Sequence, residues 1–398
     1  MKQSAADTPV SRWAGATGRS VLGSGVFLVA FGTNVSTPFL ITYKERLSLG
    51  DSATMAIFTV YVLGIVAILP VAGQLSDRFG RRMVAVPFVV LSAISSIVMI
   101  LGRDSFGLLL FGRFLLGLVS GAVLSIGAAW MQELFGRGLE QRSAVLTTVL
   151  TYAGFGAGPL VSALILELDA WPLVLPYALH AGTTMAIIPF LLKVPQSSER
   201  SREPFRPNFG VPPEGRPLFK RIIAPAAIWV FAFPSTSFAL FPVLVSDAIG
   251  ASTVLVAAIA AALTAWSGLS SRPLLPRLGP TRTLHVGMVS GTSGYVLGAI
   301  AFETGAWGLV LFAAVLLGAA SGLITSASLA LLAGVADEAS RGTINGTFYL
   351  LAYPGMVMPI VLTTLARFIE QTPALIAVTV LAALATLKLI REPSLPTA

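Results

Sequence analysis

The sequence predicts an all-α integral membrane protein with twelve transmembrane helices. Of its 398 residues, 55% are hydrophobic and only 11% are charged, whereas soluble domains carry roughly 25% charged residues. The mean hydropathy is +0.84. The apolar residues gather in repeated stretches of about 20 residues, the length at which a helix crosses the hydrocarbon core of a bilayer. The solvent for most of the chain is therefore lipid.

The composition also excludes several kinds of site. Cysteine is absent, so the chain has no disulfide framework, no thiolate metal site and no thiol nucleophile. The net charge of +8 is spread among short loops between the apolar stretches and forms no basic tract. Nucleic acid is therefore not an expected partner.

Six spans are predicted in each half of the chain. Those of the first half lie near residues 20–43, 52–76, 83–101, 106–130, 143–166 and 172–192. Those of the second half lie near residues 222–246, 252–270, 283–302, 306–335, 342–366 and 373–390. Residues 193–221, between the halves, hold six prolines and ten charged residues, which is typical of a hydrophilic linker. The predicted domains are a six-helix bundle over 1–192, the linker over 193–221, and a second bundle over 222–398.

The basic residues predict the orientation of these spans. If the N-terminus is inside, Arg113 falls within a span and only four Lys and Arg residues fall on outer loops, namely Lys44, Arg46, Arg103 and Arg367. The other 21 of the 26 then lie inside, as the positive-inside rule requires. Both termini are expected to be cytoplasmic, and no cleavable signal peptide is expected.

The two halves carry traces of an internal repeat. At an offset of 199 residues, Leu75, Arg78 and Gly80 recur as Leu274, Arg277 and Gly279. At an offset of 200, Pro159 in the fifth span is matched by Pro359 in the eleventh. Many secondary transporters are built from two halves related by an axis along the membrane normal. The repeat therefore predicts two pseudo-symmetric six-helix bundles.

The loop after the second span carries a motif of glycines and charges, formed by Gly73, Leu75, Asp77, Arg78, Gly80, Arg81 and Arg82. This motif is similar to the signature that the major facilitator superfamily carries between its second and third helices. The resemblance implies that family's fold and transport by alternating access. The glycines would let the helix end and the loop pack closely, while Asp77 and the arginines would form charge-assisted bonds. The motif is either a structural contact that holds one conformation closed or a gating ion pair.

The fourth span contains an arginine well inside the apolar stretch. The segment from Arg113 to Gly121 resembles the family's helix-four motif, although Leu116 stands where the family usually has glutamine. A cation at this depth is costly unless it is paired or hydrated. Arg113 therefore either snorkels towards the surface or faces the pathway, where it would bind an anionic group or shift the protonation of a neighbour.

The fifth span contains Gly154, Gly158 and Pro159, which resemble the motif of antiporters of the superfamily, especially drug exporters, although Ser162 stands in place of the last glycine. Small residues let another helix approach closely, and proline interrupts the backbone ladder. This segment is either a general packing site or a switch for export. The resemblance favours export over uptake.

The resemblance also implies which residues line the pathway. Polar and aromatic residues at mid-depth of the expected pathway helices are Asn34, Tyr61, Arg113, Tyr152, Phe231, Phe233, Trp266, Asn345 and Tyr349. Such a lining suits an amphipathic organic solute. Packing against lipid or neighbouring helices would also explain many of these aromatic residues.

The energy source is expected to be an ion gradient, because no Gly-x-x-x-x-Gly-Lys-Ser/Thr phosphate loop occurs. Proton antiporters usually place a carboxylate at membrane depth, but no predicted span has one near its middle. His180 and His285 are the remaining groups in the spans that could titrate, and either could instead be a packed structural residue.

The expected function is secondary active transport, namely proton-coupled efflux of a small amphipathic drug or metabolite. An uptake symporter or facilitator for an organic acid, sugar or vitamin is the alternative. A membrane-embedded enzyme or receptor is more distant, because His-Glu-x-x-His and other catalytic motifs are absent. No catalytic residue, metal or cofactor is expected. The expected partners are the substrate, a coupling proton and the lipid bilayer, with the chain as a monomer in a bacterial inner membrane.

Overall fold

The computed structural model describes residues 15–136, 138–169, 171–196, 210–335 and 341–392. Within these ranges the regular secondary structure is helical, as predicted. Ten helical stretches are long and apolar enough to cross a membrane, and α8 (Leu175–Leu191) is a shorter apolar helix. With α2 (Ala16–Asn34) at the place of the first predicted span, these stretches correspond to the twelve predicted helices.

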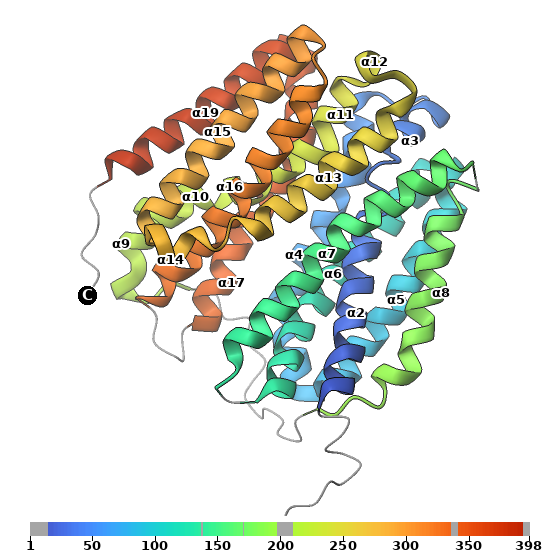
Figure 1. The fold of residues 1–398 in the computed structure, drawn as a ribbon, viewed down its shortest axis with the longest axis vertical. Coiled ribbons are helices and arrows are strands. Elements are labelled where there is room, and N and C mark those ends of the chain that lie inside the picture. Colours follow the sequence, from blue (N-terminus) through green and yellow to red (C-terminus); the bar gives the residue numbers. More distant parts are fainter. Residues whose placement is uncertain (1–14, 137, 170, 197–209, 336–340, 393–398) are drawn as a thin grey trace, which may run out of the picture. The chain divides into compact units, whose positions relative to one another are not determined.

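The chain divides into two compact units, whose helices are labelled in Figure 1. Unit 1 comprises Met1–Asn34, Leu63–Gly158 and Ala170–Pro207, and unit 2 comprises Val35–Val62, Pro159–Asp169 and Asn208–Ala398. All of the predicted second bundle falls in unit 2, and most of the predicted first bundle falls in unit 1. The division of the chain at 193–221 stays a prediction, since residues 197–209 lie outside the described ranges.

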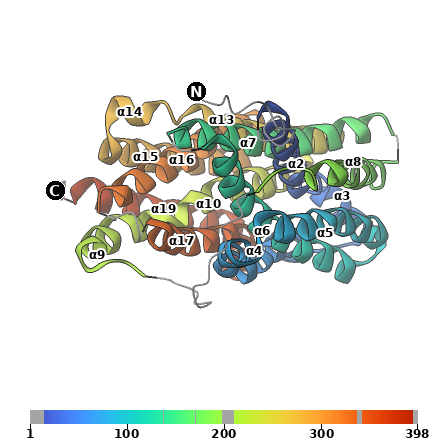
Figure 2. The ribbon, with the colours of Figure 1, turned by 90° about the horizontal axis from the view of Figure 1, so that it is seen from below.

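Unit 1 begins with α2. Its other helices are α4 (Asp51–Phe79) from Leu63 onwards, α5 (Arg81–Leu101), α6 (Phe106–Phe135), α7 (Glu140–Glu167) up to Gly158, and α8. The helix α2 packs against α6 and α8, while α5 packs against α6 and α8 (Figures 1 and 2). The buried core between these helices includes Val29, Val89, Ile126 and Leu191.

Unit 2 holds the helices of the second half. They are α9 (Arg216–Leu218), α10 (Ala224–Ser235), α11 (Phe241–Leu244), α12 (Ser246–Ile249), α13 (Thr253–Ser270), α14 (Leu274–Leu278), α15 (Pro280–Thr304), α16 (Gly308–Ala333), α17 (Arg341–Ala352), α18 (Met358–Ile369) and α19 (Gln371–Arg391). The helix α16 packs against both α13 and α15 (Figure 2). The short helix α3 (Leu40–Arg46) also belongs to this unit.

The first predicted span is shorter than expected. A continuous helix over 20–43 is wrong, because α2 ends at Asn34 and the chain turns before α3 begins at Leu40. Pro38 lies within the turn. Proline has no amide hydrogen and disfavours helical geometry in the residue before it, so a helix rarely continues through such a position. The last carbonyl groups of α2 therefore need partners from elsewhere.

The seventh and eleventh spans are interrupted helices. In the seventh, the π-helical segments η3 (Phe219–Ile223) and η4 (Thr236–Leu240) flank α10, and the helical run starts ahead of the predicted residue 222. In the eleventh, the 3₁₀ segment η6 (Tyr353–Val357) separates α17 from α18. Pro359 cannot donate to the carbonyl of Gly355, which accepts the backbone N–H of Met358 and, at 3.4 Å, the Ser235 hydroxyl.

The predicted internal repeat has a structural counterpart at two glycines. Gly80 precedes α5 with φ 98° and ψ 145°, and Gly279 precedes α15 with φ 74° and ψ 163°. Both lie in a region of backbone conformation that only glycine enters readily. The same sharp connection between two helices therefore occurs once in each unit, at the offset at which the sequence motif recurs.

Candidate functional site

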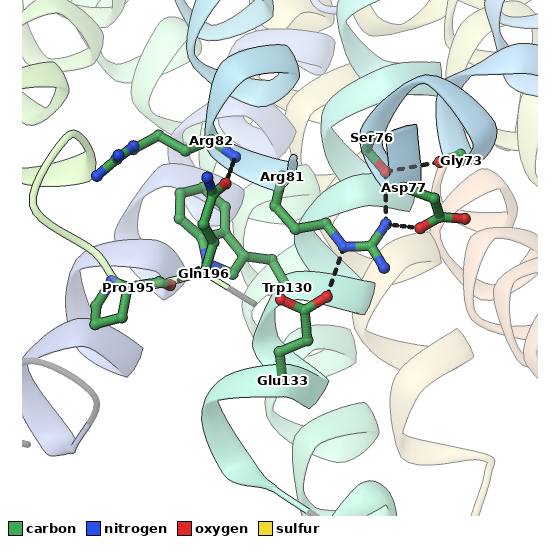
Figure 3. A network of polar contacts seen from close by, with 9 residues as sticks. All are labelled: Gly73, Ser76, Asp77, Arg81, Arg82, Trp130, Glu133, Pro195 and Gln196. Carbon is green, nitrogen blue, oxygen red and sulfur yellow. Dashed lines mark hydrogen bonds and ion pairs between the residues drawn. The ribbon is translucent and has the colours of Figure 1, made fainter. Parts of the chain in front are cut away.

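A network of charges joins three helices of unit 1 at the loop between α4 and α5 (Figure 3). Arg81, the first residue of α5, forms an ion pair with Asp77 near the end of α4. Its Nε lies 2.8 Å from Oε1 of Glu133 on α6, and its Nη1 donates to the Ser76 hydroxyl at 2.6 Å. One guanidinium therefore holds the ends of α4, α5 and α6 together.

A second set of hydrogen bonds beside this network reaches the segment that follows α8. The backbone N–H of Arg82 donates to Oε1 of Gln196 at 2.7 Å, and its Nη1 donates to the carbonyl of Leu192 at 2.6 Å. The indole N–H of Trp130 on α6 donates to the carbonyl of Pro195 at 2.6 Å (Figure 3). The segment after α8 is thus tied to α5 and α6 at the same end of unit 1.

The two glycines of the motif differ in what surrounds them. A Cβ on Gly80 would stand 3.0 Å from the amide of Gln196, whereas a Cβ on Gly73 would meet nothing within 4 Å. The close packing predicted for both glycines is therefore present at Gly80 and not at Gly73. Of the other motif residues, Leu75 is half-buried and Arg78 is exposed.

Sequence reasoning missed Glu133, Trp130 and Gln196 as parts of this network. One signal was available for Glu133, because an acid at the end of an apolar span is complementary to the basic motif. The other two residues carry no such signal. Their partners are a backbone N–H and a backbone carbonyl, and only the folded chain decides which backbone groups lie near.

We expect Asp77→Asn to leave expression near normal and to slow transport about tenfold, equivalent to about 1.4 kcal/mol between two conformations. The lost ion pair is half-exposed, with Asp77 at 46%, so the loss of stability should stay under about 1 kcal/mol. Arg81 keeps its bonds to Glu133 and Ser76. Initial rates of uptake into vesicles, normalised to the amount of protein, measure the effect.

The matched control for Asp77→Asn is Asp51→Asn at the other end of α4. Asp51 is 44% exposed and pairs with Lys44 at 2.7 Å, so the same chemical change removes a similar ion pair away from the motif. The control should transport at the parental rate. Transport at the parental rate by both variants would show that the motif carboxylate has no gating role.

Arg113 on α6 is buried at 1% exposure. Its Nη1 donates to the carbonyl of Thr33 at 2.8 Å, and Thr33 is the last residue but one of α2. The Thr33 hydroxyl lies 2.9 Å from that of Ser120. The guanidinium therefore does not reach the surface, as snorkelling would require. It sits at the C-terminal end of an interrupted helix, where the helix dipole favours a cation.

Two more of the predicted pathway residues lie near the same end of α2. The side-chain amide of Asn34 donates to the carbonyl of Phe155 on α7 at 3.4 Å. The ring of Tyr152 lies 6.2 Å from that of Phe155, edge to face. The last turn of α2 is thus bonded to α6 through Arg113 and to α7 through Asn34.

The glycines of α7 allow this helix to approach α2 closely. A Cβ on Gly154 would stand 2.5 Å from the carbonyl oxygen of Phe27, and a Cβ on Gly158 would overlap the carbonyl group of Phe31. Pro159 lies within the unbroken helix α7. The predicted close helix crossing is therefore present. Whether it acts as a switch for export stays a prediction.

In unit 2, aromatic residues gather where the two interrupted spans meet. The rings of Phe231 and Tyr353 are stacked at 4.7 Å, and Tyr349 lies 6.3 Å from Tyr353. The remaining predicted pathway residues of unit 2 differ in burial, with Tyr61 buried, Asn345 half-buried and Trp266 exposed at 44%. Among the described residues, no group of His, Asp or Glu side chains could hold a metal ion.

Phe233, another predicted pathway residue, packs inside unit 2 between α10 and α15. It is fully buried, and its ring lies 5.2 Å from Trp229 and 5.1 Å from Tyr295. A Cβ on Gly291 of α15 would overlap the ring. Phe233 is therefore placed as a packing residue that joins α10 to α15, because the missing side chain of Gly291 leaves room for it.

The fold and these sites define a membrane transporter, and comparison with known proteins agrees. The family model of the Major Facilitator Superfamily matches residues 22–359. The chain belongs to this superfamily.

Similar proteins include the tetracycline resistance protein, class G, of Vibrio anguillarum, which is 26% identical over 339 residues covering 81% of this chain and 83% of that protein. The bacillibactin exporter of Bacillus subtilis (strain 168) is 27% identical over 162 residues, which cover 39% of this chain and 40% of the exporter. The crystal structure of the POT family transporter PepTSo is similar in fold, with a TM-score of 0.74 at 13% identity, and covers 94% of this chain and 96% of that chain.

Proposed function

We propose that this chain is a secondary active transporter that exports a small amphipathic organic compound in exchange for protons, by alternating access. The observation that carries the proposal is the likeness to a tetracycline resistance protein over 81% of the chain. Resistance conferred by a membrane transporter is achieved by outward transport, and a second relative is named as an exporter. At 26% and 27% identity, these relatives support a class of compound, which is the small amphipathic organic solute named above.

The geometry of unit 1 supports alternating access. Such transport needs an element with two discrete arrangements. The ion network around Arg81 offers bonds that can break and re-form, because its three side-chain partners come from two helices and Asp77 is half-exposed. The end of α2, which Arg113 and Asn34 hold, gathers polar groups from α2 and α6 between the helices of unit 1. Irregular backbone at membrane depth is tolerated where it is buried in protein or lines a water-filled path.

Everted membrane vesicles test the proposal. Vesicles from a strain without its own exporters should accumulate tetracycline or another amphipathic compound when the interior is acidified, and should lose the compound when a protonophore removes the pH gradient. Right-side-out vesicles that accumulate a labelled organic acid, sugar or vitamin through this chain would instead establish the uptake alternative. Compound transport that is unaffected by the protonophore would contradict proton coupling.

The orientation is a further part of the proposal. Because 21 of the 26 Lys and Arg residues fall on one side in the predicted topology, fusions of a reporter after Arg206 and at the C-terminus should both report the cytoplasm. A reporter active only in the periplasm, such as alkaline phosphatase, and one active only in the cytoplasm, such as green fluorescent protein, measure this. Periplasmic activity at either position would rule out twelve spans with both ends inside.

A further inference from the structure

The buried histidine of α8 has both ring nitrogens bonded. His180 is 0% exposed, with Nδ1 at 2.7 Å from the Ser96 hydroxyl on α5 and Nε2 at 3.1 Å from the carbonyl of Leu28 on α2. A carbonyl only accepts, so Nε2 carries a hydrogen, and in the neutral imidazole Nδ1 then accepts from the hydroxyl of Ser96. The neutral imidazole therefore satisfies both contacts, one to each neighbouring helix.

Among the described residues of α2, α5 and α8, which meet at this imidazole, there is no Asp or Glu. The charged residues of α2 and α5 are Arg19, Arg81 and Arg82, which lie towards the opposite helix ends, and the titratable neighbour on α8 is Tyr177. The helices α5 and α8 run antiparallel. One turn from the contact of His180 with Ser96, they carry the buried hydroxyl groups of Ser92 and Thr184. A buried imidazolium without an anionic partner is unfavourable, so this setting suits the neutral form.

The imidazole also lies directly against the backbone of α2. A Cβ on Gly32 would overlap the ring, at 2.8 Å from Cδ2 and closer still to other ring atoms. The ring of Phe31 stacks at 6.3 Å. The next residue, Thr33, is the one whose carbonyl accepts from Arg113. The last turn of α2 is thus held by a histidine contact at Gly32 and an arginine contact at Thr33.

We propose that His180 is a positioning residue, which acts as a neutral clamp on the last turn of α2 and is not the carrier of the coupling proton. By fixing Leu28 and Gly32 it sets where Thr33 and Asn34 stand relative to Arg113. The part of this inference that concerns the proton rests on the proposed function. The clamp itself rests on the contacts of His180 alone.

The first test needs no substrate, because the chain has no cysteine and a single Asn34→Cys substitution gives a unique thiol. We expect the rate of maleimide labelling at position 34 to rise about tenfold when His180→Ala is added, since the last turn of α2 then opens more often. Gly182→Ala, on the same helix with no atom within 4 Å of the added Cβ, is the control and should leave the rate unchanged. An unchanged rate with His180→Ala would overturn the clamp.

The second test uses the contact between His180 and Gly32. Gly32→Ala alone should raise labelling at position 34 and lower transport, because the added methyl group and the imidazole compete for one space. Adding His180→Ala to Gly32→Ala should raise labelling little further, because the methyl group has already displaced the ring, so the two changes should be strongly non-additive. Purely additive effects would show that the ring does not bear on α2 at this position.

The third test separates a clamp from a proton carrier. His180→Gln offers an amide N–H to Leu28 and an amide oxygen to Ser96, so it should keep low labelling and the parental pH profile of transport. His180→Asn is the second variant should the glutamine not fit. Low labelling with loss of the pH dependence would identify His180 as the proton carrier and overturn the proposal. If the parental protein shows no proton-coupled transport, the proposed function fails, while both labelling tests still decide the clamp.

Discussion

Replacement of Arg113 by glutamine should remove most transport from a protein that still inserts and purifies. The charge-assisted bond from Arg113 to the carbonyl of Thr33, at 2.8 Å, contributes about 1.5–3 kcal/mol. A glutamine side chain is shorter and neutral, so it neither reaches that carbonyl nor complements the helix dipole of α2. Transport in vesicles, normalised to purified protein, measures the loss, which we expect to be at least about tenfold.

Two further variants sharpen the result for Arg113. Arg113→Lys should recover part of the rate, since lysine keeps the charge but not the planar guanidinium. Arg103→Gln makes the same chemical change at an exposed arginine, 45% exposed and paired with Asp104, and should be neutral. If Arg113→Gln transports at the parental rate from about pH 5.5 to about pH 8, a range that brackets histidine titration, the importance assigned to Arg113 is wrong.

A methyl group at Gly355 should destabilise unit 2 and abolish transport. In Gly355→Ala the Cβ would overlap the carbonyl oxygen of Ile228 and stand 2.7 Å from the backbone nitrogen of Ala232. Both neighbours are backbone atoms of α10, so neither can rotate away, and η6 and α10 must separate. Overpacking of this kind costs about 1–3 kcal/mol or more. Thermal unfolding in detergent and transport rates measure the two effects.

Gly346→Ala is the matched control for Gly355→Ala. It lies in α17, the helix that precedes η6, and a Cβ there meets nothing within 4 Å. Because alanine is favoured over glycine within a helix by about 0.5–1 kcal/mol, this variant should be as stable as the parent or slightly more stable. Equal melting temperatures for both variants would show that α10 and η6 are not in close contact.

Parts of the candidate site were predictable where a residue's chemistry limits its surroundings. Arg113 stood out because a charge within an apolar stretch must be paired, and the structure gives it a partner. Asp77 and Arg81 carry opposite charges and lie four residues apart, on the two sides of the connection at Gly80, so a charge-assisted bond between them was a natural expectation. Phe233 packs against α15, and the sequence did not indicate this contact because an aromatic residue in a span suits lipid, the pathway or the core equally well. Only the glycine on a different helix decides between them.

The sequence by itself determined the solvent and the number of spans, because apolar stretches of helical length have one favourable environment. It also indicated the sharp connections at Gly80 and Gly279, because the positive φ that each connection uses is readily adopted by glycine. Only the tertiary structure decided which carbonyl Arg113 holds and that His180 touches the backbone at Gly32. These contacts join residues that are 80 or more positions apart, or 148 for His180 and Gly32. No local preference encodes them, because backbone groups are alike in every residue until packing brings a particular one near.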